Sequence, residues 1–183
     1  GSGLPAARDY RDHPELYQGG DYVMHAPDDL RTRLPDFASL IIGPIAETVP
    51  AFRQRLQREA PIGYVSLDVD YYFSAVDALE IFTGEPEHYL PLVNLYLDDC
   101  HETYHNPAAG ELLALREFND RQPLRRAYPY TALRERRLFK NAAWLTKIFA
   151  LHVLDHPART TGSTRDFTRS IDNPYLDRSR KVA

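Results

Sequence analysis

The chain has little sulfur and no long apolar run. Its 183 residues include one cysteine, Cys100, and one methionine. A single cysteine excludes an internal disulfide and a multi-cysteine zinc motif, and it is typical of a reducing compartment. No apolar stretch approaches the roughly 20 residues that span a bilayer, and the polar start lacks the pattern of a secretory signal. The sequence therefore predicts a cytoplasmic protein without a membrane partner.

An excess of charge of either sign is also missing. The chain has 22 basic and 26 acidic residues and a net charge of −4, which gives no reason to expect a nucleic acid partner. The 43% apolar and 26% charged contents are ordinary for one globular domain of this length. We assign residues 1–157 to an α/β domain. Residues 158–183 are polar and rich in arginine, serine and threonine, and we expect a loosely packed or disordered tail there.

Two apolar runs of six residues, Ile62–Leu67 and Leu92–Leu97, stand in the middle of the chain. Between them, Ser74–Phe82 has apolar residues at helical spacing, and Ser74 with Asp77 forms a capping box. Strand, helix and strand in this order, with continuous apolar strands, are typical of a parallel sheet that is buried on both faces. We therefore predict an α/β fold with a mostly parallel sheet.

Further elements are predicted on either side of this unit. A strand over Ala38–Ile42 is expected beside Ile62–Leu67 in the middle of the sheet, and a helix capped by Thr48 is expected to run from Pro50 to about Glu59. The remaining predicted elements are a short helix over Asp28–Leu34, a helix over Glu111–Asn119, a short strand over Leu124–Tyr128 and a closing strand over Lys147–Leu154. Residues 1–36 are otherwise expected to be loops. Their cluster Asp9–His13 either lines a pocket or, as we favour, covers a surface.

Acidic residues follow both central runs directly: Asp68, Asp70, Asp98 and Asp99. The carboxyl ends of parallel strands meet at one edge of a sheet, and ligands bind at that edge. Carboxylates placed so close together repel each other unless they bind a cation or share a proton. The sequence therefore predicts a metal site at this edge. The alternative is that the acids cap helices or form salt bridges in loops.

Three segments match the motifs of one enzyme group in order and spacing. They are G-x-x-x-E-T-V-P at residues 43–50, L-D-V-D-Y-Y at 67–72, and the pair Asp98-Asp99. Through them, roughly residues 38–155 resemble the class I methyltransferases that use S-adenosylmethionine. The resemblance is closest to the metal-dependent sugar O-methyltransferases of antibiotic pathways, the macrocin O-methyltransferase group.

This resemblance implies a Rossmann-like sheet, S-adenosylmethionine and Mg²⁺ as cofactors, and a small hydroxylated acceptor such as a sugar or other polyol. By the motif, the metal ligands are Asp68, Asp98 and Asp99. Asp70 is then the base that takes the proton from the hydroxyl group. Mg²⁺ prefers carboxylate, water and substrate oxygens, so this set of residue types suits it.

One feature of that group is missing from the chain. The group begins with a strand and a glycine-rich turn that cradles the cofactor, and a second strand ends in an acid that holds the ribose. Residues 1–5 resemble the loop after that second strand, so we expect an N-terminally incomplete methyltransferase domain and leave its cofactor-binding residues unassigned. The alternative is a non-catalytic remnant or partner-binding module. An incomplete sheet also leaves an exposed edge, which predicts a homo-oligomer.

The residues after the second acidic pair offer a weaker alternative. His101 and His105 lie four apart, which is compatible with zinc binding. Their loop-like surroundings near Pro107 argue against a helical zinc motif, and we favour His101 as a residue of the acceptor pocket. Cys100 is expected to be a small buried residue.

Overall fold

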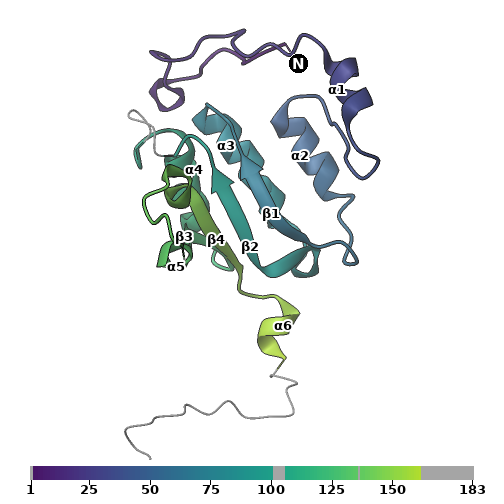
Figure 1. Cartoon of the computed structure of the whole chain (residues 1–183), viewed down its shortest axis with the longest axis vertical. Coiled ribbons are helices and arrows are strands. Elements are labelled where there is room, and N and C mark those ends of the chain that lie inside the picture. Colours follow the sequence, from purple (N-terminus) through teal and green to yellow (C-terminus); the bar gives the residue numbers. More distant parts are fainter. Residues whose placement is uncertain (1, 101–105, 136, 162–183) are drawn as a thin grey trace, which may run out of the picture.

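The computed structural model describes residues 2–100, 106–135 and 137–161. Within these ranges it has a mixed α/β fold with an open sheet of four strands in the order β1-β2-β4-β3 (Figure 1). The strands are β1 Ile62–Leu67, β2 Tyr89–Leu97, β3 Arg125–Pro129 and β4 Ile148–Val153. β1 is parallel to β2, whereas β4 is antiparallel to both β2 and β3. Three strands therefore run in one direction and β4 runs against them.

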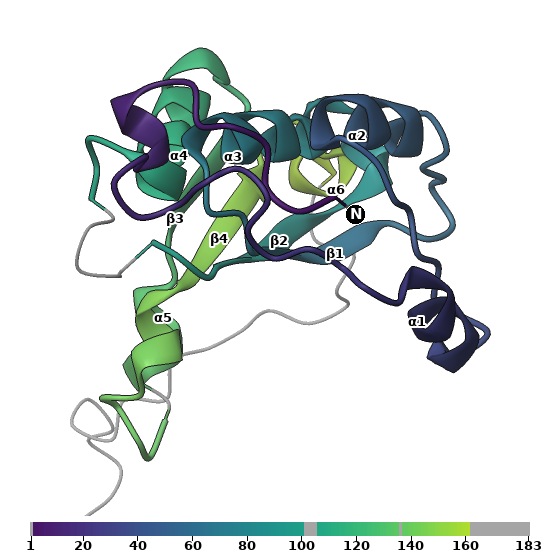
Figure 2. The ribbon, with the colours of Figure 1, turned by 90° about the horizontal axis from the view of Figure 1, so that it is seen from above.

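Three helices lie side by side over one face of the sheet (Figure 2): α2 Ile45–Arg53, α3 Tyr72–Leu79 and α4 Gly110–Arg121. The core lies between these helices and the sheet. There, the ring of Phe82 lies 6.3 Å from that of Phe118 and 6.2 Å from that of Tyr89. All three side chains are almost completely buried. Because each aromatic ring removes a large apolar area from water, this cluster is a major source of stability.

Shorter elements connect the main ones. They are α1 Pro27–Arg33, α5 Thr131–Glu135, α6 Pro157–Thr160, and the 3₁₀ turns Tyr10–Asp12, Glu80–Thr83, Pro86–His88 and Ala143–Thr146. In the part of the chain that the structure describes, every helix is too short or too polar to cross a membrane.

The other face of the sheet is open, although the sequence predicted burial on both faces. The strand register places Tyr64, Asn94, Ala150 and Tyr128 in one row across this face. Tyr64 is 60% exposed and Tyr128 is 53% exposed. The prediction was wrong because the side chains of β1 alternate between a buried and an exposed face, although most of its residues are apolar. Leu67 points to the helices, while Tyr64 and Ser66 point to solvent.

The predicted strand over Ala38–Ile42 is also wrong. These residues form no regular secondary structure. A strand is stable only when a neighbouring strand pairs with it, and no described segment pairs with residues 38–42. As a consequence β1 lies at the edge of the sheet rather than at its centre.

The other predicted strands are confirmed, whereas several helix boundaries differ. β1 has the predicted bounds, β2 begins three residues earlier, and β3 and β4 agree within about one residue. Tyr71, not Ser74, is the N-cap of α3, so the predicted capping box does not form. α2 begins at Ile45, directly after Pro44, and Thr48 lies inside it, where its hydroxyl donates to the Pro44 carbonyl at 3.0 Å.

The first residues of the predicted tail are ordered against the domain. Arg159 of α6 donates to the carbonyl oxygens of Val153 at 2.7 Å and Pro91 at 2.6 Å. These bonds join α6 to the start of β2 and the end of β4. Residues 162–183, the rest of the predicted tail, lie outside the described residues.

Candidate active site

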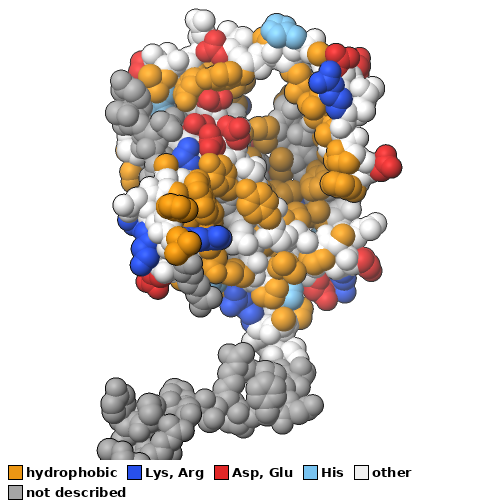
Figure 3. Space-filling model, in the orientation of Figure 1, with side chains coloured by type: hydrophobic (Ala, Val, Ile, Leu, Met, Phe, Trp, Pro, Cys, Tyr) orange, Lys and Arg blue, Asp and Glu red, His pale blue; other side chains and the backbone are white. Residues whose placement is uncertain are grey.

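The acidic residues lie at one edge of the sheet, as the sequence predicted. Leu67 and Leu97 are paired at the ends of β1 and β2, and the Asp98 N–H donates to the Leu67 carbonyl at 3.0 Å. Asp68 and Asp98 therefore follow adjacent strand ends. Figure 3 shows acidic side chains gathered on this face of the molecule.

Helix α4 adds a fifth acid, Glu111, which sequence analysis missed. Its side chain is 1% exposed, and its Oε2 accepts a hydrogen bond from the Asp99 N–H at 3.0 Å. The backbone N–H of Val69 also donates to this carboxyl group. Glu111 thus bridges the ends of β1 and β2. We call Asp68, Asp70, Asp98, Asp99 and Glu111 the acid cluster.

A signal for Glu111 was present in the sequence. Glu111, Leu115 and Phe118 recur at the spacing of one helix face, and Leu115 and Phe118 are apolar. An acid on the apolar face of a predicted helix is rarely buried unless it has partners. From the sequence, Glu111 was named only as the first residue of the predicted helix.

Two members of the acid cluster, Asp99 and Glu111, have raised pKa values and therefore hold their protons more tightly than ordinary carboxylic acids. Burial raises the pKa of Asp99 to about 6, and the charges of Asp70 and Asp98 add to this rise. Burial raises the pKa of Glu111 to about 8, and Asp99 adds to it. Within the described ranges, Asp99 Oδ2 and Glu111 Oε1 are buried without a hydrogen-bond partner. A proton or a cation between these oxygens would relieve the repulsion.

Asp98 is in the opposite situation. Its Oδ1 accepts a hydrogen bond from the Tyr96 hydroxyl at 2.8 Å and lies 3.2 Å from Lys147 Nζ. The Tyr96 hydroxyl, followed by the hydrogen bond and charge of Lys147, lowers the pKa of Asp98. Asp98 is therefore ionised and already paired with a cation. For this residue the structure favours the salt bridge that the sequence left open.

The N-terminal arm, residues 2–26, crosses the same edge of the sheet (Figure 1). Burial raises the pKa of Asp70, the charge of Asp68 adds to this, and a hydrogen bond from Tyr17 acts against it. Farther along the arm, the charge of Asp70 is the largest cause of a raised pKa of Tyr22. Tyr17 and Tyr22 therefore lie close enough to the acid cluster to interact with it.

The arm is anchored at the beginning of α3. Asp12 is 1% exposed and accepts hydrogen bonds from the backbone N–H groups of Arg8 at 2.7 Å and Phe73 at 3.2 Å. The Arg8 guanidinium lies 3.8 Å from the centre of the Phe73 ring. His13 is also buried. Asp9, Arg11 and Asp12 line a small pocket of about 140 Å³ against α3, which agrees with the alternative that this cluster lines a pocket rather than only covers a surface.

The cluster is not assembled as a metal centre in this conformation. Among residues 2–100, 106–135 and 137–161, no three His, Cys, Asp or Glu side chains form a group that could hold a metal ion. His101 and His105 of the zinc alternative lie outside these residues. Cys100 is buried as predicted, and burial raises the pKa of its thiol to about 12, which excludes a thiolate nucleophile near neutral pH.

Comparisons with known protein families, curated proteins and solved structures gave no match. The functional assignment therefore depends on the geometry and chemistry of the residues themselves.

Proposed function

We propose that this protein carries out metal-assisted O-methylation of a hydroxyl group on a sugar or other small polyol, with S-adenosylmethionine as the methyl donor. One observation carries the proposal: the acids after β1 and β2 converge at the carboxyl edge of a parallel strand pair joined by a helix. Ligands bind at such edges in open α/β sheets. The same unit supports the interpretation of the sheet as Rossmann-like.

The donor set suits a hard cation such as Mg²⁺. Asp99 offers a buried oxygen without a partner, and Asp68 is exposed beside it at the adjacent strand end. These two residues would hold the cation, and Asp98 would join them on leaving Lys147. A bound divalent cation lowers the pKa of a hydroxyl group that coordinates it.

Asp70 suits the role of general base. Its pKa is raised by burial, and this brings a carboxylate closer to the range where it accepts a proton efficiently at neutral pH. The hydrogen bond from Tyr17 fixes its orientation. Tyr71 and Tyr72, which follow it, are both buried and hold the loop against the core.

Calorimetric titration of the chain with S-adenosylhomocysteine, with and without Mg²⁺, tests the proposal. We expect heat of binding that is larger with Mg²⁺, and loss of this difference in Asp99→Asn. Asp120→Asn is the matched control, because Asp120 is an exposed acid of α4 away from the cluster. Absence of binding under both conditions would contradict autonomous cofactor binding by this chain.

A second candidate is a partner-binding module without catalysis. It is favoured by the pairing of Asp98 with Lys147, which occupies one proposed metal ligand. Mg²⁺ titration alone separates the two candidates. A binding module leaves the cation without effect, whereas the enzyme binds it through Asp68 and Asp99.

A further inference from the structure

The segment that follows α5 projects from the molecule and carries two neighbouring apolar side chains. Figure 2 shows α5 and the residues after it standing out from the face of the sheet opposite α2, α3 and α4. Leu138 is 96% exposed and Phe139 is 82% exposed. Apolar side chains that gather in water mark a surface that interacts with another molecule. We call residues 137–142 the projecting loop.

Side-chain contacts hold the projecting loop in this form. Arg134 of α5 donates from Nε to the Lys140 carbonyl oxygen at 2.7 Å and from Nη2 to Asn141 Oδ1 at 3.2 Å. The Arg137 guanidinium lies 5.7 Å from the centre of the Trp144 ring. A loop that is already held in its projecting form loses less conformational entropy when it binds. The two apolar side chains are therefore presented on a preorganised loop.

The surroundings of the two apolar side chains are basic. Residues 131–146 contain four basic residues and one acidic residue, whereas the whole chain has a net charge of −4. Arg134, Arg137 and Lys140 are all exposed. Trp144 is 42% exposed beside Arg137, and tryptophan is enriched where a membrane meets water. Cations beside exposed apolar and aromatic side chains are typical of a segment that binds an anionic membrane surface.

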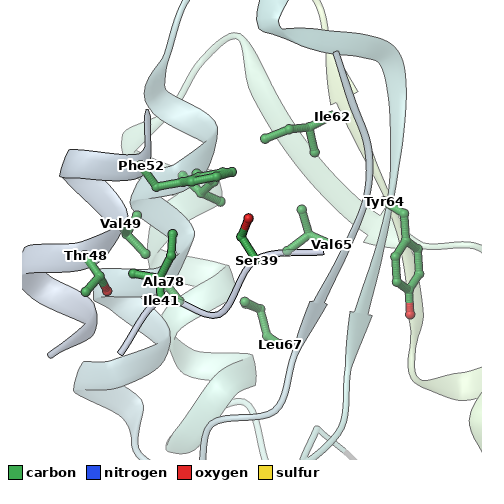
Figure 4. A pocket seen from close by; sticks show the side chains of 11 residues that line it. Ser39, Ile41, Thr48, Val49, Phe52, Ile62, Tyr64, Val65, Leu67 and Ala78 are labelled. Atoms are coloured by element: carbon green, nitrogen blue, oxygen red, sulfur yellow. The ribbon is translucent and has the colours of Figure 1, made fainter. Parts of the chain in front are cut away.

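An apolar groove elsewhere in the molecule lacks this combination. It has a volume of about 410 Å³ and lies between Val49 and Phe52 of α2 and Val65 of β1 (Figure 4). None of the side chains that line it is charged. The groove is hollow and uncharged, whereas the projecting loop is convex and basic. An anionic layer that a loop can enter therefore matches the projecting loop in both shape and charge.

We propose that the projecting loop binds the surface of a bilayer that contains anionic phospholipids. Leu138 and Phe139 enter the layer beneath the headgroups, and Arg137 and Lys140 pair with lipid phosphates. A nucleic acid is a poorer match, because it offers charge but no apolar layer for Leu138 and Phe139. A protein partner would need a hollow of matching shape, whereas fluid lipid adapts to the loop.

Binding at the surface needs no membrane-spanning segment. The prediction that the protein has no membrane partner was based on the lack of such a segment, so it leaves surface binding open. The inference also does not depend on the proposed methyl transfer.

The test uses the full chain, with Trp144, the only tryptophan in the sequence, as the reporter. The probes are vesicles of phosphatidylcholine, either pure or with about one third phosphatidylserine. With the anionic vesicles we expect a saturable blue shift of the tryptophan emission, and weaker binding as the salt concentration rises. Binding to pure phosphatidylcholine is expected to be at least tenfold weaker. Equal binding to both vesicles, or no shift with either, would overturn the proposal.

Two pairs of variants locate the binding. Phe139→Ala removes one inserted ring, and we expect at least tenfold weaker binding. Phe37→Ala is the matched control, because Phe37 is 92% exposed and lies outside the loop. Lys140→Gln should weaken binding severalfold, and Arg33→Gln, at an exposed arginine of α1, should not. Equal losses in the two phenylalanine variants would contradict binding through the loop.

The same variants separate the lipid surface from other occupants of the loop. A loss in Lys140→Gln without a loss in Phe139→Ala would indicate purely electrostatic binding, as to a nucleic acid, and would overturn insertion. Sedimentation velocity without lipid tests for a second copy. If Phe139→Ala converts a dimer into a monomer, the loop is an interface between copies and the membrane proposal is wrong.

Discussion

β1 and β2 follow the same pattern in the sequence but lie in different environments. Each contains a six-residue apolar run that ends in carboxylates, and the two strands are parallel neighbours. Leu95 of β2, between β1 and β4, is completely buried, whereas its register partner on the same face, Val65 of β1, is only partly buried. The position of a strand in the sheet, rather than its composition, therefore determines how much it contributes to the core.

The acids that follow the two strands differ in the same way. Asp98 after β2 is ionised by its contacts with Tyr96 and Lys147, while Asp68 after β1 is exposed. Asp99 and Glu111 stand between the two strand ends with raised pKa values. Acidic residues at strand ends therefore differ in their chemistry. Their neighbours decide whether a carboxyl group stays protonated, pairs with a lysine or is available to a metal ion.

The largest expected effect is on the free energy of unfolding, when side chains of the two strands are truncated. Leu95→Ala removes a completely buried side chain and is expected to lower the free energy of unfolding by about 4 kcal/mol. Tyr64→Ala, at an exposed position, is expected to change it by about 0.5 kcal/mol or less. Urea denaturation measures both. Similar losses in the two variants would show that the sheet face that carries Tyr64 is as buried as the face that carries Leu95.

The next effect is a dependence of stability on pH. The pKa of Glu111 is about 8 in the folded protein against an ordinary value of 4.5, so the folded state binds the proton more tightly than the unfolded state. Stability is therefore expected to fall as pH rises from 5 to 8, by about 3 kcal/mol, at 1.36 kcal/mol per pKa unit. Urea denaturation across this range should show a flatter profile for Glu111→Gln. An unchanged profile would mean that Glu111 does not hold the proton.

Mg²⁺ is expected to stabilise the fold through Asp68 and Asp99. At a hundredfold excess over the dissociation constant, the gain is about 2.7 kcal/mol. Asp99→Asn should abolish this gain in thermal melts, while Asp70→Asn and the control Asp120→Asn should retain it. If Asp99 is only a cap, Asp99→Ala instead costs about 1 kcal/mol with or without the cation.

The smallest expected effect on stability comes from the ion pair between Asp98 and Lys147. Lys147→Met removes the ammonium group 3.2 Å from the Asp98 carboxylate, and the partly exposed pair is expected to contribute less than about 1 kcal/mol. NMR titration should show a higher pKa of Asp98 in the variant. The remaining Tyr96 hydroxyl should keep that pKa below its ordinary value. An unshifted pKa would assign the effect to Tyr96 alone.

The sequence predicted the local pattern well and the neighbours of each strand poorly. The spacing around β1, α3 and β2 was sufficient to place Asp68 and Asp98 at one edge, because parallel pairing fixes that geometry. Residues 38–42 have strand composition, but pairing depends on a partner that composition does not reveal. Glu111 was missed, and the role of Asp12 within the cluster Asp9–His13 was left open, because the burial of both residues depends on contacts with residues far away in the chain.

The N-terminal arm is anchored beside the acid cluster by a contact between residues that are far apart in the sequence. The hydrogen bond from the Phe73 N–H to Asp12 joins residues that are 61 positions apart. Closing so long a loop costs entropy, so contacts of this kind form after the local ones and open before the core does. The arm can therefore detach while the core stays folded, and its detachment removes the hydrogen bond that Tyr17 makes with the partly exposed Asp70.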